Sequence, residues 1–174
     1  IKALKAHYYF ELLRHYGPFV VVTQNVAPNA DIDDMKLPRS PFDVCVEEIV
    51  SLLDEAMKDL PPMNQKEASR KSYHSLESAA ALKAMTLFYA ASPLFNGNPA
   101  YANFTNSKGE KLFNATRDSE KWKRAAIAAD SALHICLRNG KSLISTTSGD
   151  YVNKDLKDVI ADVSKSSLGL NFEN

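Results

Sequence analysis

Residues 75–95 read SLESAAALKAMTLFYAASPLF, and this stretch decides the fold class of the chain. Ala, Leu, Met and Phe occupy most of its positions, so a helix formed here has little polar surface on any side. Ser75 and Glu77 open it as an approximate capping box, although the usual box has its acid one place later. Pro93 predicts a kink or the last helical turn. The sequence therefore predicts that residues 75–95 form the central helix.

Two further helices are expected before this one. Residues 2–16 have apolar side chains on two sides of the expected helix, which predicts that it packs between neighbours. Ser40 is the expected N-cap of a helix over residues 41–60, with Pro41 at its first position. The two apolar stripes of the first helix are Ala3, Ala6, Phe10 and Leu13, and Leu4, Tyr8, Leu12 and Tyr16.

A fourth helix is expected over residues 118–138, and a weaker fifth over residues 153–163. The long connections are residues 17–39 and 96–117. No run of β alternation occurs, so the predicted class is all-α, with residues 1–174 forming part of one domain. The expected buried stripe of the fourth helix is Trp122, Ala125, Ala126, Ala129, Leu133 and Cys136.

Composition narrows the class of function. The 174 residues include 21 Lys plus Arg and 21 Asp plus Glu, so the formal net charge is zero. Nucleic-acid-binding proteins usually have a basic excess, so we expect no nucleic-acid partner. No apolar run approaches the roughly 18–20 residues of a membrane span. Because the helical pattern starts with the opening residues, we expect the chain to be an internal fragment of a longer protein.

The second long connection contains the candidate ligand-binding residues Asn96, Asn98, Tyr101 and Phe104. Loops this long are uncommon unless they are functional. Aromatic rings can stack on sugar faces while amides supply hydrogen-bond donors and acceptors, so this composition suits a polyhydroxylated ligand. The alternative is an ordinary loop that its aromatic residues anchor.

Other candidate sites are weaker. His7 and Glu11 have the i,i+4 spacing of a metal or acid–base pair, but such pairs are more often helix surface contacts. Trp122 could stack on a sugar, or belong to the core as the first residue of an Ala-rich stripe. The acidic run 31–34 lacks the Gly and Glu that an EF-hand requires. We therefore predict no catalytic residues, no metal and no cofactor.

The two cysteines, Cys45 and Cys136, lie on apolar faces of expected helices. Free cysteines in such places behave as small hydrophobic residues, and this is the interpretation that we favour. A disulfide between them is the alternative.

The order of these elements resembles that of a known family. The Ala-rich helical hairpins are similar to tetratricopeptide repeats, and YYFELLRHYG at residues 8–17 resembles a helix of SusD/RagB-family proteins. The later matches to that family follow in the same order, so the resemblance covers residues 3–140. They are PRSPFDV at 38–44, AMKDLP at 56–61, the Ala-rich helix at 79–90, LFNGNPAYANF at 94–104, and WKRAAIAA at 122–129.

The resemblance implies a tetratricopeptide-like α-α superhelical scaffold within a larger lipoprotein of Bacteroidetes-type bacteria. Such a protein lies at the outer face of the outer membrane, held by a lipid on an N-terminal segment that this chain does not contain. It is the partner of a SusC-like TonB-dependent transporter and captures a nutrient, with glycan as the expected ligand class and peptide as the other. No catalysis is implied.

Two alternatives stay open at this stage. The first is a tetratricopeptide-like protein–protein interaction scaffold without ligand capture, whose helices present a concave surface to a soluble partner. The second is an enzyme, which is the least favoured because no group of titratable residues converges in the sequence.

Overall fold

The computed structural model describes residues 1–23, 27 and 29–141 of the chain. Every element named below belongs to the unit Ile1–Asn139. The predicted fifth helix, residues 153–163, lies outside the described residues. No helix among the described residues is long and apolar enough to cross a membrane.

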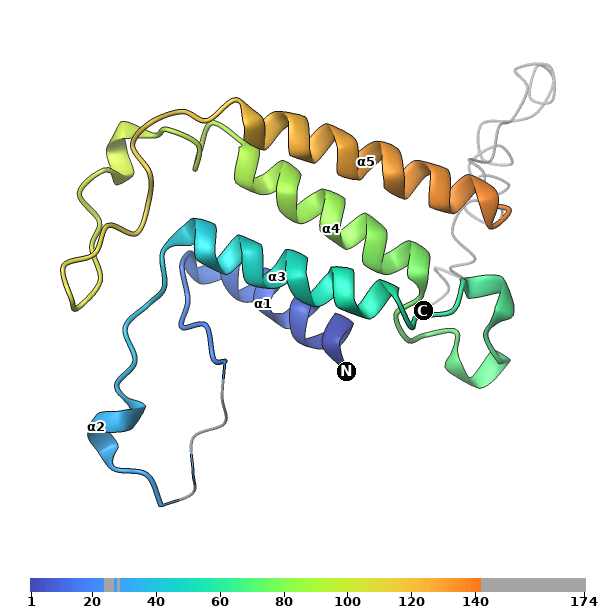
Figure 1. Cartoon of the computed structure of the whole chain (residues 1–174), viewed down its shortest axis with the longest axis horizontal. Coiled ribbons are helices and arrows are strands. Elements are labelled where there is room, and N and C mark those ends of the chain that lie inside the picture. The colour runs from blue at the N-terminus through green and yellow to red at the C-terminus, as the bar shows by residue number, and fades with distance from the viewer. Residues whose placement is uncertain (24–26, 28, 142–174) are drawn as a thin grey trace, which may run out of the picture. The chain divides into compact units, whose positions relative to one another are not determined.

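Long helices form the body of the described part of the chain (Figure 1). The fold class is all-α: within residues 1–23 and 29–141 the one β-type pairing is an isolated bridge between Thr105 and Lys111. The long helices are α1 (Lys2–Tyr16), α3 (Phe42–Met57), α4 (Leu76–Ala91) and α5 (Glu120–Arg138), and a short helix, α2 (Ile32–Met35), lies in the first long connection. Three 3-10 turns cover Met63–Gln65, Ala68–Arg70 and Pro99–Tyr101.

Successive long helices pack side by side and run in opposite directions (Figure 1). α3 lies between α1 and α4, and α4 lies between α3 and α5. This is the helical-hairpin arrangement that the Ala-rich pattern predicts, because small side chains on α4 and α5 allow two helix backbones to approach each other. The core of the bundle includes Phe10, Leu13, Ile49, Leu53 and Leu87, all of them buried.

α1 buries one of its two apolar stripes. Ala3, Ala6, Phe10 and Leu13 face α3 and α4 and are buried. The second stripe is exposed: Tyr16 is 76% exposed and Tyr8 62%. The prediction that this helix packs between neighbours is therefore not met among the described residues, because its neighbours α3 and α4 both meet the same side of it. Leu4 and Leu12 complete the exposed stripe.

The helix ends differ from the sequence predictions in two places. Pro41, not Ser40, is the N-cap of α3, because the Ser40 hydroxyl instead accepts a hydrogen bond from the Val21 backbone N–H. The capping box of α4 is closed by Ser78 in place of an acid: Ser75 Oγ accepts from the Ser78 N–H, and Ser78 Oγ accepts from the Ser75 N–H. α4 stops at Ala91, before the proline that the sequence offered as its end.

The buried stripe of α5 is one position away from much of the predicted one. Ala125, Ala128 and Ala132 are buried, whereas the predicted Ala126, Ala129 and Leu133 are exposed. Both sets have helical spacing, so the pattern permits either, and packing against α4 selects the first. Trp122 is half-buried with its ring edge-on to Phe88 at 5.5 Å between centroids, and it packs against the core, which is the second of the two roles predicted for it.

Candidate functional site

The connection between α4 and α5 is fastened where it begins and ends. The Asn96 amide nitrogen donates to the Asp118 carbonyl at 2.7 Å, and its oxygen accepts from the Asp118 N–H at 2.8 Å. Gly97 has φ of +80°, and a Cβ there would lie 2.7 Å from the Arg117 backbone nitrogen. The loop therefore needs a glycine at this crossing.

A second amide, Asn106, organises the far end of the same loop. Its oxygen accepts from the backbone N–H groups of Lys108 and Glu110, at 2.9 and 3.0 Å. Its nitrogen donates to the Arg39 carbonyl, 67 residues away in the sequence, at 2.9 Å. The loop is therefore joined to the segment that leads into α3. Sequence reasoning missed this residue, because nothing local distinguishes it from the other asparagines of the loop.

The aromatic residues of the loop pack as one cluster against the start of α3. Phe42 stacks on Phe95 with ring centroids 4.6 Å apart, and Tyr101 lies 4.9 Å from Phe113. Phe104 is edge-on to Tyr101 at 5.7 Å, and it is 50% exposed. The loop thus has an aromatic core of its own, and the rings of Tyr101 and Phe104, which are more exposed than those of Phe42 and Phe95, lie at its margin.

A cavity of about 340 Å³ opens between this cluster and the C-terminal end of α1. Its volume is at the lower end of the range for small-molecule sites. Rings and hydroxyls come from α1, α4 and the loop, while cationic groups come from α1 and the segment before α3. The side chains that lend it chemistry are Tyr16, Tyr89, Tyr101, Phe104, Arg14 and Arg39, and we call this cavity the aromatic pocket.

The polar groups of the aromatic pocket are available to a ligand. The phenol hydroxyls of Tyr16, Tyr89 and Tyr101 make no hydrogen bond to any residue that the structure describes. Burial raises the pKa of Tyr89, and the nearby Arg14 opposes that rise. The Arg14 guanidinium itself pairs with Glu11 at 3.1 Å and lies over the Phe10 ring.

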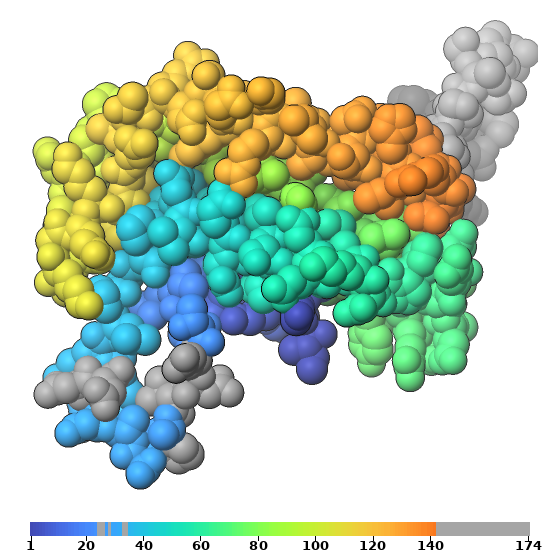
Figure 2. All heavy atoms as spheres, in the orientation of Figure 1, coloured from blue at the N-terminus to red at the C-terminus, as the bar shows by residue number. Residues whose placement is uncertain are grey.

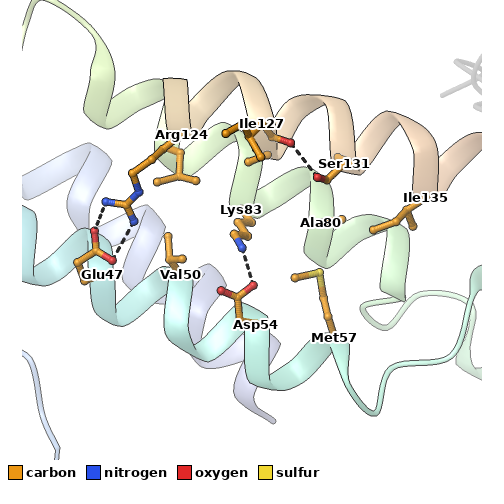
Figure 3. A pocket seen from close by; sticks show the side chains of 13 residues that line it. Glu47, Val50, Asp54, Met57, Ala80, Lys83, Arg124, Ile127, Ser131 and Ile135 are labelled. Carbon is orange, nitrogen blue, oxygen red and sulfur yellow. Dashed lines mark hydrogen bonds and ion pairs between the residues drawn. The ribbon is translucent and has the colours of Figure 1, made fainter. Parts of the chain in front are cut away.

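A second hollow of about 370 Å³ lies between α3 and α5, over α4 (Figure 3). In the space-filling view the atoms of α4 are visible between those of α3 and α5 (Figure 2). The Arg124 guanidinium of α5 bridges to Glu47 of α3 at one end, and Lys83 of α4 pairs with Asp54 at 2.6 Å. Val50, Met57, Ala80, Ile127 and Ile135 supply apolar lining, and we call this hollow the α3–α5 groove.

Solved structures share the fold of this chain. A SusD-like protein from Bacteroides fragilis NCTC 9343 aligns with 52% of this chain and 16% of its own, at 24% identity and a TM-score of 0.45, which is too slight a likeness to argue from. BT4246 is 31% identical over 94% of this chain, with a TM-score of 0.76. The match to BT4246 agrees with the ordered helix motifs of residues 3–140. The chain is SusD-like.

The match to BT4246 recurs in its selenomethionine form, at 34% identity over 82% of the chain and a TM-score of 0.68. The SusD-like chain spans 30% of the length of BT4246 in the first alignment and 24% in the second. No model of a known protein family matches it, and no functionally curated protein does.

In this SusD-like chain the four predicted ligand residues fall into two pairs. Tyr101 and Phe104 line the aromatic pocket. The amides of Asn96 and Asn98 serve the loop itself: Asn98 accepts from the Ala100 N–H at 3.0 Å and donates to the Leu94 carbonyl, beyond the end of α4. Contact of these residues with a ligand stays a prediction, and the hydrogen bonds favour a loop-holding role for the two asparagines.

The sequence pattern did not reveal the pocket's two arginines or Tyr89. Arg14 lies within the helix motif of α1, and Tyr89 within α4, so neither stands out locally as a ligand group. Arg39 reaches the pocket through the long-range bond between its carbonyl and Asn106. Only the three-dimensional structure shows that Arg14, Arg39 and Tyr89 line the same pocket.

The remaining sequence candidates are accounted for as follows. The His7 ring lies 5.4 Å from the His74 ring, while Glu11 pairs with Arg14 and His15. No group of three or more metal-ligating side chains occurs among the residues described. The two cysteines are free thiols, so no disulfide joins α3 to α5.

Proposed function

We propose that the chain is part of a nutrient-capture protein at the bacterial cell surface, which binds glycan and passes it to a SusC-like TonB-dependent transporter. SusD-like membership supports the general role. The observation that carries the proposal for this chain is the aromatic pocket, where Tyr101 and Phe104 present rings beside three phenol hydroxyls that make no hydrogen bond to a described residue. Rings that stack on a sugar face, next to groups that donate and accept hydrogen bonds, are what a polyhydroxylated ligand requires.

We propose that the protein lies at the cell surface and releases its ligand chemically unchanged. The protein would lie at the outer face of the outer membrane, anchored through a lipid on an N-terminal segment, with the transporter as its membrane partner. Its role would be binding, with release of the same molecule. No cofactor or metal is needed for that role.

The pocket part of the proposal is tested by removing its rings. In the full-length protein, Tyr101→Ala combined with Phe104→Ala should weaken binding of the glycan ligand by about tenfold or more, because the stacking surface is lost. Tyr73→Ala, which removes a ring that is 67% exposed in the connection before α4, is the matched control and should bind like the wild type. Unchanged affinity in the double variant would place the ligand elsewhere.

The partner part of the proposal has its own test. The tagged full-length protein, purified from detergent-solubilised cell envelopes, should bring with it a TonB-dependent barrel transporter as the dominant protein in mass spectrometry. A soluble protein as the dominant partner would favour the alternative function.

That alternative is a protein–protein interaction scaffold, and the α3–α5 groove is the observation that favours it. An apolar hollow between parallel helices of a hairpin array is a common place for a peptide or helix to bind. Ile127→Arg would place a cation in the groove, and the scaffold function predicts that it abolishes partner binding. Ala100→Arg would place a cation on the loop outside the groove, and it should leave partner binding intact.

A further inference from the structure

The aromatic pocket has an excess of positive charge. Two guanidinium groups, Arg14 and Arg39, are among the described residues that line it, and no carboxylate is. In the α3–α5 groove, by contrast, each cation faces an acid that lines the same groove: Arg124 faces Glu47, and Lys83 faces Asp54. The difference matters because an unbalanced cation beside aromatic rings attracts an anionic group on a ligand.

Arg39 is the arginine of the pocket that is available. Its guanidinium makes no ion pair or hydrogen bond with any described residue, whereas Arg14 already pairs with Glu11 at 3.1 Å. Binding an anion at Arg39 would therefore not require breaking a contact of its guanidinium with any described residue. Arg14 would add a second, weaker attraction.

The backbone that follows Arg39 is held in place by three hydrogen bonds. Its carbonyl accepts from the Asn106 amide at 2.9 Å, and the next N–H, of Ser40, donates to the Phe19 carbonyl at 2.9 Å. Two residues further on, the Phe42 N–H donates to the Leu112 carbonyl at 2.8 Å. Bonds to both long connections thus fix the point from which this side chain extends, which lowers the ordering cost of using it in a site.

We infer that the aromatic pocket binds an anionic sugar residue, with its carboxylate or sulfate on Arg39 and its ring against Tyr101 and Phe104. This inference rests on the proposed function and names the class of glycan. The guanidinium offers two parallel N–H donors, which match the two oxygens of a carboxylate or of a sulfate. The phenol hydroxyls of Tyr16 and Tyr89 remain for the neutral hydroxyls of the sugar.

A glycan panel separates this inference from the function on which it rests. The full-length protein is applied to neutral, uronate-containing and sulfated oligosaccharides, and the anionic members should be preferred. Selection of neutral glycans alone would overturn the anionic inference and leave nutrient capture standing. Binding of no glycan at all would overturn both. The ratio of uronate to sulfate binding tells which anion the pocket accepts.

The role of Arg39 is tested with a matched pair of ligands and a matched pair of variants. Trigalacturonate and its methyl ester have the same three sugar rings and differ in charge. A sulfated galacto-oligosaccharide and its desulfated form serve as the pair if the panel selects sulfate. Arg39→Gln should weaken binding of the charged member on the order of tenfold and leave the neutral member unchanged. Arg39→Lys should fall between, because it keeps the charge and loses the fork. Arg138→Gln, at the end of α5, is the control.

Ionic strength provides a readout that needs no variant. Affinity for the charged ligand should fall as salt rises from low to 0.5 M, while affinity for its neutral form should not change. Equal affinity of Arg39→Gln and wild type for the charged ligand, or equal salt dependence of both ligands, would overturn the assignment.

Discussion

The Arg124 guanidinium on α5 donates two hydrogen bonds to the Glu47 carboxylate on α3, with nitrogen–oxygen distances of 2.5 and 2.9 Å. The pair spans the α3–α5 groove, so it connects two helices that are separated by α4 in the packing order. Its side chains are 46% and 55% exposed, and water therefore screens much of the attraction.

We expect this bridge to contribute little to stability. A double-mutant cycle with Arg124→Met and Glu47→Gln should give a coupling free energy of about 0.5–1 kcal/mol in urea unfolding, the upper part of the range for exposed pairs because the contact is bidentate. The neighbouring pair Lys123 and Glu120, on a single helix, should couple by less. A coupling of several kcal/mol would mean that the bridge is shielded from water.

Glu77 should be more important for stability than an average surface acid. It is 6% exposed in the first turn of α4, and both carboxylate oxygens accept from the Met63 N–H, at 3.2 and 3.0 Å. Glu77→Gln replaces a charge-assisted hydrogen bond with a neutral one and removes a favourable charge from a helix N-terminus, so the unfolding free energy should fall by about 1–2 kcal/mol. Glu67→Gln, at an exposed position, should change it by less than about 0.5 kcal/mol.

Asn96 tests whether the loop asparagines hold the loop or bind the ligand. Asn96→Ala removes the hydrogen bonds to both backbone groups of Asp118. The free energy of unfolding should therefore fall by about 1–3 kcal/mol, and the urea midpoint should fall with it. Asn103→Ala, at an exposed position of the same loop, should leave the midpoint unchanged. If Asn96→Ala weakens glycan binding without lowering the urea midpoint, the sequence-based prediction that Asn96 binds the ligand is right.

His74 should make stability depend on pH in the mildly acidic range. Burial lowers its pKa in the folded state, and the nearby positive charges of His7 and Lys66 lower it further. The unfolded state therefore binds the proton more readily, since its pKa is about 6.5. The contribution of neutral His74 to the free energy of unfolding is therefore complete above the unfolded-state pKa. It is lost as the pH falls from that pKa toward the lower pKa of the folded state.

The measurement is the urea midpoint between pH 7.5 and pH 5. The wild type should lose stability across this window, and His74→Asn should lose less, because the proton-binding difference at that position is gone. His134→Asn, on the exposed side of α5, should behave like the wild type. Identical pH profiles for wild type and His74→Asn would refute the role of this ring.

The two thiols should differ in reactivity. Cys45 is buried, and burial raises its pKa to about 11, while its Sγ contacts the Phe19 carbonyl at 3.5 Å. Cys136 is partly exposed near the end of α5. At pH 8 a thiol-specific reagent should therefore modify Cys136 in the folded protein and Cys45 only after unfolding. Modification of both at equal rates would contradict the buried environment of α3.

Local sequence patterns were enough to predict the all-α class and most of the helical elements. Periodicity and end signals are local: Gly17 and Pro18 stop α1, Pro61 and Pro62 follow α3, and the apolar length of residues 75–95 requires a central helix. These features act through backbone conformation and neighbouring turns, so they can be read without knowing the rest of the fold. The family resemblance rested on the same ordered motifs.

Tertiary structure alone decided which faces and loops meet. Two helical stripes on α5 have equally good spacing, and contact with α4 buries Ala125, Ala128 and Ala132. Arg39 enters the aromatic pocket because Asn106, 67 residues away, binds its carbonyl. Helix formation depends on residues three and four positions apart, whereas the pocket depends on hydrogen bonds between segments whose distance in sequence leaves no periodic signal.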